Sequence, residues 1–260
     1  MISISPRKLP TIPHILRSDF LNKNMAAAPF GAAVFLRSKG MKHYTDILFD
    51  LDGTLTDSSG GITDCFRRAM EAFGYPCPSV EELKRQIIGP PIEASMLHYG
   101  VAEETVEAMT KEFRVHYNDH GWCNNRVYDG IPELLKRLHD GGFRLSLATS
   151  KPEHFAKRIM EHFDLAQYFY GIHGALPHKD INAKEAVMAN ALAGLPEDAV
   201  CLMVGDRKHD MEGAAYHGLD AAGVLFGFGS REELEAFSPV FLAETPAELG
   251  DFLLQATESR

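Results

Sequence analysis

Asp50 and Asp52 carry the clearest chemical signal in the chain. They are separated by one residue, follow the apolar run 47–49 and precede Gly53, which permits a sharp turn. A run of this kind is typical of a buried parallel strand. Acids at the carboxyl end of such a strand are costly in free energy unless a cation or ligand meets them. Ligands bind at that end of open α/β sheets, so these residues predict a site rather than a plain Asp-Gly turn.

Asp206 and Asp210 repeat this pattern further along the chain. The apolar run 200–204 leads into Asp206, and Asp210 follows four residues later, near the start of an expected helix. Helix capping would account for Asp210 alone but does not account for Asp206. We interpret His209 beside them as a loop or helix-start residue, with substrate contact as the less favoured alternative.

Two neighbouring hydroxyl residues and two lysines of interest lie between the acidic pairs. Thr149, Ser150 and Lys151 follow a short apolar strand pattern, and Pro152 opens a helical one. Hydroxyl groups and backbone amides at a helix N-terminus form a ready anion site, although helix capping alone would also explain Thr149 or Ser150. Lys184 stands at the start of another helical pattern, where a solvated surface lysine is the plain alternative.

In their order along the chain, these residues resemble the four signatures of the haloacid dehalogenase-like hydrolases. The signatures are matched by Asp50 with Asp52 in Asp-x-Asp-Gly-Thr, by Thr149, by Lys184, and by Asp206 with Asp210 in Gly-Asp-x-x-x-Asp. The resemblance covers nearly all of the chain from Met41 onward. It implies hydrolysis of a phosphate monoester.

The resemblance also implies a role for each residue. Asp50 would attack phosphorus and form an aspartyl-phosphate, and Asp52 would act first as the acid and then as the base. Thr149, with Ser150 beside it, would bind the transferring phosphoryl group. Lys184 would offset the charge of that group.

Mg²⁺ is the cofactor that the resemblance implies. It would be bound by Asp50, by the backbone carbonyl of Asp52 and by Asp206. Asp210 would hold the waters of the metal or orient Lys184. The implied substrate is a small phosphorylated metabolite, phosphoglycolate-like or a nucleotide.

Several alternatives stay open at this point. Lys179, in the middle of a loop, rivals Lys184 as the phosphate-binding lysine. A sugar-phosphate mutase would share the same core, because only the cap decides whether water or a sugar hydroxyl accepts the phosphoryl group. A catalytically silent binding module on the same fold is a third possibility, against which the intact set of acids and lysine argues.

The elements that must position these residues alternate in type. After about residue 127, strand patterns alternate with helical ones; the strands are expected at 144–148, 199–204, 221–225 and 240–242. The helices are expected at 131–140, 152–163, 183–192, 211–217 and 231–237, and from Pro246. This alternation predicts an α/β fold, a doubly wound, Rossmann-like parallel sheet with helices on both faces. The run 223–230 lacks the spacing of a nucleotide-binding loop and is expected to border the site at the sheet edge.

A helical segment interrupts this alternation after the first strand. Helices are expected at 62–73, 80–86, 93–99 and 103–117, with no strand between them. We expect them to form a small cap domain, 58–127, over a core made of 41–57 and 128–260. Gly89 and Pro90, in the loop 88–91, resemble the substrate-contacting cap loop of phosphoglycolate phosphatase-like and nucleotidase-like members. That loop is therefore expected to bind substrate and to set the preference for it.

Composition limits the partners and the compartment. Of the 260 residues, 45% are hydrophobic and 24% charged, which is ordinary for a soluble globular protein. The formal net charge of −10 disfavours binding to nucleic acid or to an anionic membrane. The four cysteines have no C-x-x-C or zinc-like spacing, so they are expected to be reduced, as in a cytoplasmic enzyme. Monomer and homodimer stay equally open.

The first forty residues differ from the rest. They contain one acid, Asp19, and six basic residues: Arg7, Lys8, Arg17, Lys23, Arg37 and Lys39. Their small apolar stretch, 25–36, is too short to span a bilayer. A basic, acid-poor leader of this kind is either a transit peptide or sequence upstream of the true start at Met41. We favour the second interpretation and expect the leader, 1–40, to be poorly ordered.

Overall fold

Six parallel strands form the sheet that positions the site. The computed structural model describes residues 42–176 and 184–255, which belong to one compact unit, Gly40–Arg260. The strand order is β5-β4-β1-β6-β7-β8, and every pairing is parallel. The strands are β1 (Asp46–Phe49), β4 (Arg144–Pro152), β5 (Phe169–Ala175), β6 (Cys201–Gly205), β7 (Asp220–Val224) and β8 (Phe241–Ala243).

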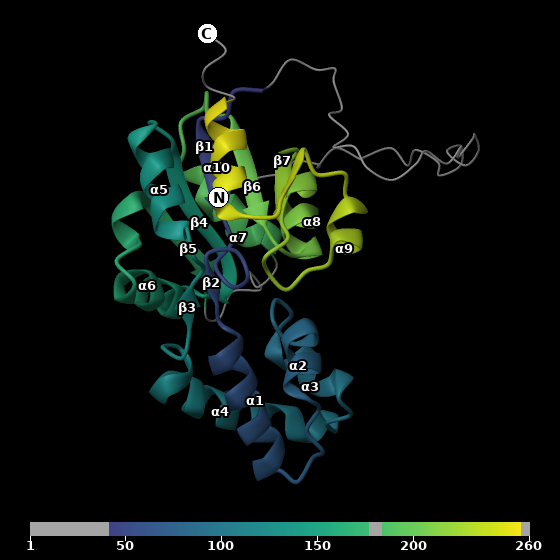
Figure 1. Cartoon of the computed structure of the whole chain (residues 1–260). Coiled ribbons are helices and arrows are strands. Elements are labelled where there is room, and N and C mark those ends of the chain that lie inside the picture. The colour runs from purple at the N-terminus through teal and green to yellow at the C-terminus, as the bar shows by residue number, and fades with distance from the viewer. Residues whose placement is uncertain (1–41, 177–183, 256–260) are drawn as a thin grey trace, which may run out of the picture. The chain divides into compact units, whose positions relative to one another are not determined.

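Helices cover both faces of this sheet (Figure 1). They are α5 (Ile131–Asp140), α6 (Glu153–His162), α7 (Lys184–Ala193), α8 (Lys208–Tyr216), α9 (Arg231–Glu235) and α10 (Pro246–Gln255), with a short 3₁₀ turn η2 (Ala166–Tyr168). Side chains alternate along the central strand β1: Ile47 and Phe49 join the hydrophobic cluster that includes α5 and α10, and Leu48 joins the cluster of α7 and α8. The predicted doubly wound α/β fold is confirmed.

Four helices separate β1 from this alternation, as predicted. They are α1 (Ser59–Ala72), α2 (Val80–Gln86), α3 (Ile92–His98) and α4 (Glu103–His116), and α4 runs into a π-helical turn η1 (Tyr117–Gly121). The side-chain oxygen of Ser79 accepts a hydrogen bond from the Glu82 amide at 3.3 Å, so Ser79 is the N-cap of α2. Figure 1 shows these cap helices gathered beyond the carboxyl ends of the strands.

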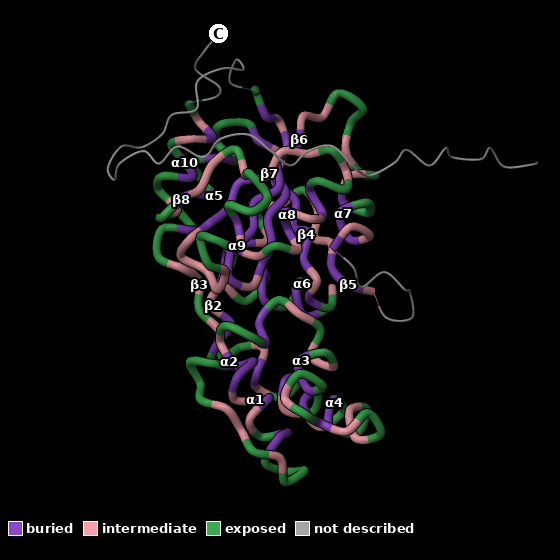
Figure 2. The backbone as a smooth tube through the Cα atoms, turned by 90° about the vertical axis from the view of Figure 1, so that its right-hand side faces the viewer, coloured by how far each residue is buried: buried purple, intermediate pink, exposed green. Residues whose placement is uncertain are grey.

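The cap helices have a hydrophobic core of their own. Phe66, Met70, Leu83, Met96 and Met109 are fully buried in it, and Figure 2 shows the buried backbone on the inner sides of these helices. We interpret this segment as the cap domain, with the sheet and its helices as the core. Two short antiparallel strands, β2 (Thr56–Asp57) and β3 (Arg126–Val127), lie at the two crossings between the segments.

Two features of the sheet differ from the sequence-based expectation. Strand β5 was not expected, because its seven residues contain Gly171, His173 and Gly174 in place of a continuous apolar run. A Cβ on Gly174 would lie 2.6 Å from the Lys151 carbonyl oxygen, so the backbones approach too closely there for a larger residue. Strand β4 also runs to Pro152, beyond the expected end at Ala148.

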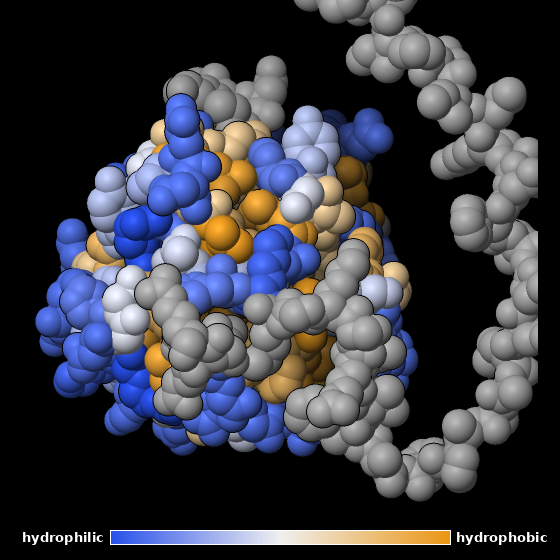
Figure 3. Space-filling view, turned by 90° about the horizontal axis from the view of Figure 1, so that it is seen from above, coloured by the Kyte–Doolittle hydropathy of each residue, from blue (hydrophilic) through white to orange (hydrophobic). Residues whose placement is uncertain are grey.

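The amino-terminal ends of the strands face away from the cap helices (Figure 1). Figure 3 views this end and shows hydrophobic side chains surrounded by polar ones. The leader, 1–40, and Lys179 lie outside the described residues, so the expectations for them stay predictions. Among the described helices, none is both long and apolar enough to cross a membrane.

Candidate active site

Asp50, Asp206 and Asp210 form an acidic cluster at the carboxyl ends of β1 and β6. These strands are neighbours, with Phe49 opposite Val204, so the residues that follow them emerge side by side. One carboxylate oxygen of each acid lies within 4.8 Å of the other two, and all three residues are buried. Sequence spacing predicted all three, and the parallel pairing brings them together.

Lys184 bridges two members of this cluster. Its Nζ lies 2.7 Å from Asp50 Oδ1 and 2.7 Å from Asp210 Oδ1, and only 3% of its side chain is exposed. Burial by itself would lower the pKa of Lys184, but Asp210 and Asp50 outweigh it and raise the pKa above its usual value. Lys184 is therefore a fixed cation, at the first turn of α7 as the sequence predicted.

The acidic cluster carries more negative charge than Lys184 balances. Burial, together with the charges of Asp210 and Asp50, raises the pKa of Asp206 well above its usual value. Burial also raises the pKa of Asp210, against the opposing effect of Lys184. Three buried carboxylates around one ammonium group favour a further cation with a preference for oxygen ligands. The residues present thus fit Mg²⁺.

Loops from both neighbouring strands hold Asp206 in place. The Phe228 amide donates to Asp206 Oδ2 at 2.8 Å, and the Thr54 hydroxyl donates to Oδ1 at 3.3 Å. Gly53 has a φ of +88°, and a Cβ there would lie 2.2 Å from Asp206 Oδ2. The glycine-containing run after β7 therefore borders the site, as predicted.

Asp52 lies in a separate ion pair with Lys151. The Lys151 Nζ lies 2.6 Å from Asp52 Oδ2, and its side chain is 4% exposed. The same ammonium lies 5.2 Å from the centre of the Tyr117 ring, which comes from η1 at the end of the cap helices. Burial would lower the pKa of Lys151, but Asp52 and Tyr117 outweigh it and raise the pKa. The other oxygen of Asp52 is buried and has no hydrogen-bond partner among the described residues.

The contacts of the remaining predicted residues do not by themselves indicate a role in binding phosphate. Thr149 is buried, and its hydroxyl oxygen accepts the Lys151 amide hydrogen at 3.3 Å, as a turn-forming residue would. Ser150 follows it in β4 and is half-buried. His209 faces Glu212, with 3.3 Å between Nδ1 and the carboxylate. The phosphate-binding roles of Thr149 and Ser150 stay predictions.

The family model of the haloacid dehalogenase-like hydrolases matches residues 47–224. The chain belongs to the haloacid dehalogenase-like hydrolases. The matched range contains both acidic pairs and the cap helices, so the family predicted from the four signatures is confirmed.

Several named proteins are similar to this chain. The tyrosine-protein kinase PtkA of Mycobacterium tuberculosis is 42% identical over 193 residues, 74% of this chain. The match covers 66% of that protein, so this chain spans about two thirds of its length. A 5'-nucleotidase of Pseudomonas aeruginosa is 39% identical over 81% of this chain and 96% of its own length. A phosphoglycolate phosphatase of Vibrio parahaemolyticus is 32% identical over 78% of this chain and 93% of its own length.

Solved structures agree with this placement. A predicted phosphatase from Clostridium acetobutylicum superposes with a TM-score of 0.76 at 38% identity, covering 82% of this chain and all of that one. PtkA of Mycobacterium tuberculosis superposes with a TM-score of 0.72 at 39% identity, covering 82% of this chain and 99% of that one. The predicted enzyme class, a phosphatase, agrees with the names of the nucleotidase and phosphatase relatives.

Sequence reasoning missed two residues of this hydrolase's site. Lys151 was noted only as part of the run after the strand, although a lysine two residues beyond Thr149 at a strand end was a usable signal. Tyr117 gave no signal, because one aromatic residue at the end of a helical pattern is more often a core residue. Lys151 meets Asp52 because β4 and β1 are neighbouring strands, and Tyr117 meets Lys151 because the end of the cap helices folds onto the core.

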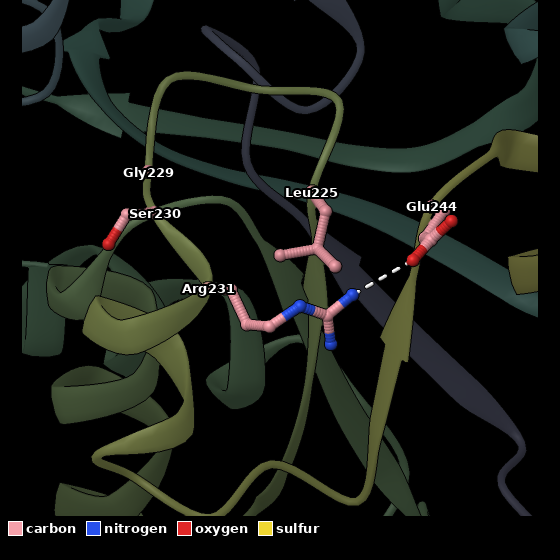
Figure 4. Close-up of a pocket in the computed structure, with 5 residues that line it drawn as sticks. All are labelled: Leu225, Gly229, Ser230, Arg231 and Glu244. Carbon is pink, nitrogen blue, oxygen red and sulfur yellow. Dashed lines mark hydrogen bonds and ion pairs between the residues drawn. The ribbon is translucent and has the colours of Figure 1, made fainter. Parts of the chain in front are cut away.

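A pocket of about 450 Å³ lies beside the acidic cluster but carries weaker chemistry. It is lined by Leu225, Gly229, Ser230, Arg231 and Glu244. Figure 4 shows Arg231 turned towards Glu244, and their charged atoms lie 2.9 Å apart. Because its two charges pair with each other, this pocket offers less for binding a phosphate ester than the acidic cluster and Lys184.

Proposed function

We propose that this hydrolase is a Mg²⁺-dependent phosphomonoesterase that acts on a small phosphorylated metabolite through an aspartyl-phosphate. The observation that carries the proposal is the contact of Lys184 with both Asp50 and Asp210 at 2.7 Å. It places a fixed cation against the expected nucleophile, where the oxygens of a phosphoryl group would need one.

The side chains of the chain supply the steps. Asp50 attacks phosphorus in line with the leaving oxygen, and a carboxylate oxygen forms the new bond as the ester bond breaks. Asp52 gives a proton to the departing oxygen and later takes one from the water that opens the aspartyl-phosphate. Lys184 offsets the negative charge of the phosphoryl oxygens throughout.

Mg²⁺ would be held by Asp50, Asp206 and the backbone carbonyl of Asp52. When bound, it supplies positive charge that reduces the repulsion between carboxylate and phosphate and stabilises the transition state. Asp210 accepts from the Arg207 amide at 3.0 Å and from Lys184, so its part is to keep the lysine in place.

Lys151 has a distinct part in this proposal. Its short contact with Asp52 fixes the position of the proton-transferring carboxylate, and the Tyr117 ring covers the ammonium from the cap side. The acid–base group is thereby held by a lysine that the cap covers, which would help to exclude bulk water from the proton transfer.

Phosphate release from a panel of phosphomonoesters, measured with Mg²⁺ and with EDTA, tests the proposal. We expect release that depends on Mg²⁺ and is greatest for one of the small substrates, phosphoglycolate or a nucleoside monophosphate. Analysis of sugar-phosphate products in the same reactions distinguishes a hydrolase from a mutase. Phosphate release that EDTA does not lower would disprove the dependence on Mg²⁺. The absence of release from any ester would favour a catalytically silent binding module.

The mycobacterial kinase relatives support a second candidate, transfer of a phosphoryl group to a tyrosine hydroxyl. The name of that relative and its 42% identity are the observations in favour. The test is incubation with ATP, Mg²⁺ and a tyrosine peptide. Phosphotyrosine formed by the wild-type protein but not by Asp50→Asn would favour this candidate, and hydrolysis without peptide labelling would favour the first.

A further inference from the structure

Arg207 links the acidic cluster to the cap. It directly follows Asp206, and its backbone amide donates to Asp210 Oδ2 at 3.0 Å. Its backbone is therefore fixed by the same carboxylate that holds Lys184. Its side chain is 11% exposed and leads away from the cluster, towards the cap helices.

Two groups hold the guanidinium of Arg207. Nε donates to Glu233 Oε1 at 3.0 Å, and Nη1 donates to the backbone carbonyl of Ile88, in the loop between α2 and α3. The same Glu233 oxygen accepts the Lys208 amide at 2.8 Å, so Glu233 ties the start of α8 to α9. One planar guanidinium thus joins a cap carbonyl to a carboxylate of the core, which is a geometry that lysine cannot reproduce.

Glycines make room for this side chain on both sides. A Cβ on Gly89 would lie 3.3 Å from Arg207 Nη1, and Gly89 has a φ of +106°. A Cβ on Gly229 would lie 3.4 Å from Arg207 Cδ. Phe228, beside Gly229, packs against the hydrophobic cluster of the cap helices. The arginine therefore runs between the cap loop, 88–91, and the loop that binds Asp206.

We propose that Arg207 is a positioning residue that sets the substrate preference of this hydrolase by fixing the cap loop relative to the acidic cluster. Arg207 directly follows Asp206 and donates to the Ile88 carbonyl, so it ties the backbone of the cap loop to the acidic cluster. In the proposed reaction, the cap loop would lie on the side of the leaving group. The kinetic part of this inference rests on the proposed phosphomonoesterase function.

The kinetic test compares Arg207→Lys and Arg207→Met with Arg231→Met. Arg231 is a matched control, because it forms ion pairs with Glu235 and Glu244 on α9 and after β8. We expect both Arg207 variants to raise the KM for phosphoglycolate at least tenfold, while kcat with a generic aryl phosphate changes less than threefold. A fall in kcat/KM by the same factor for both substrates would overturn the inference, because it would indicate a structural role only.

A readout independent of turnover separates this inference from the proposed function. The amide of Ile87 bonds to the Leu83 carbonyl at 2.9 Å at the start of the cap loop. In Arg207→Met we expect hydrogen exchange in peptides across 83–92 to be at least tenfold faster than in the wild type and in Arg231→Met. Unchanged exchange would overturn the inference even if the enzyme is a phosphatase. Faster exchange would support it even if no tested ester is hydrolysed.

Gly89→Ala tests the same contact from the cap side. The added methyl group would lie against the Arg207 guanidinium, and the backbone conformation disfavours any residue but glycine. We expect the same rise in KM for phosphoglycolate as in the Arg207 variants, with Asp206 and Asp210 untouched. A Gly89→Ala enzyme with wild-type preference and wild-type exchange would contradict the inference. This variant also keeps the test valid if Arg207→Met does not fold.

Discussion

Lys184 and Lys151 are both buried against aspartates, but their surroundings differ. Lys184 faces two acids of a cluster of three, and every member comes from the sheet and its helices. Lys151 faces Asp52 alone, and its other neighbour, Tyr117, comes from the end of the cap helices. The first region is left with an excess of negative charge, and the second is balanced.

This difference indicates a division of tasks. An uncompensated acidic cluster is unfavourable without a cation, so it favours binding Mg²⁺ with a phosphate ester. A balanced pair needs no ligand to be stable, so it suits a group that must stay in one position for proton transfer. The cap reaches the second region through Tyr117, and it reaches the first through Arg207 and Phe228.

The strongest test of the first region is Asp50→Asn. The amide cannot act as a nucleophile, so we expect kcat to fall at least a thousandfold, roughly 4 kcal/mol of transition-state stabilisation. The fold should persist, because Asp210 still pairs with Lys184. Phosphate release and circular dichroism measure the two effects. Asp140→Asn, at an exposed surface pair, is the control, and an Asp50→Asn enzyme with wild-type turnover would rule out the nucleophile.

The second region is tested by Lys151→Met. Without the ammonium, Asp52 loses its 2.6 Å partner and is no longer held for proton transfer. We expect kcat to fall about a hundredfold, ~2.7 kcal/mol, with KM nearly unchanged. Loss of one partner of a buried pair also costs about 3–5 kcal/mol of stability, so kinetics must be measured well below the melting temperature. Lys157→Met, at an exposed pair on α6, is the control; a rise in KM at constant kcat would assign Lys151 to substrate binding instead.

The difference between the two regions also explains what the sequence could predict. Asp50 and Asp206 were predictable because each ends an apolar strand, and neighbouring parallel strands bring such residues together. The pairing of Asp52 with Lys151 was not predicted, although β1 and β4 are also neighbours, because a lysine after a strand is more often a surface residue than a buried one. The contact with Tyr117 depends on how the cap packs, which no local pattern encodes.

The fold was also predictable only in part. Helix α5, with four buried apolar residues, and helix α2, with a capping serine before it, were both expected at the bounds that the structure has. Strand β5 was not expected, because it lies at the sheet edge and carries two glycines where a central strand would carry apolar residues. Edge strands need less burial, so they leave a weaker hydrophobic pattern.

Replacing the cap loop, 88–91, tests whether the cap sets preference while the acidic cluster sets the chemistry. In the proposed mechanism the core residues would contact only the groups that every substrate shares, so discrimination would come from what covers the leaving group. We expect the ratio of kcat/KM between phosphoglycolate and an aryl phosphate to shift about tenfold, ~1.4 kcal/mol. If both substrates fall by the same factor, the loop is a structural support and specificity lies elsewhere.

The smallest expected effect concerns the excess charge of the acidic cluster without metal. Burial, with Asp210 and Asp50, raises the folded-state pKa of Asp206 above its usual value of 3.8. The folded chain therefore binds more protons than the unfolded chain between these two pKa values. The stability that this group contributes is present at low pH and is lost as pH rises through the folded-state pKa.

Chemical denaturation of the wild type and Asp206→Asn between pH 5 and 8 in EDTA measures this contribution. Acids with lowered pKa values, such as Asp57, are common to both proteins and cancel in the difference. We expect the stability of Asp206→Asn to rise relative to that of the wild type as pH rises, because the amide has no proton to lose in the buried cluster. Mg²⁺ should make the wild type the more stable of the two proteins, because the variant lacks the carboxylate of Asp206 as a metal ligand. A difference that does not vary with pH or Mg²⁺ would show that the acidic cluster carries no uncompensated charge, and the contrast with the Asp52–Lys151 pair would fail.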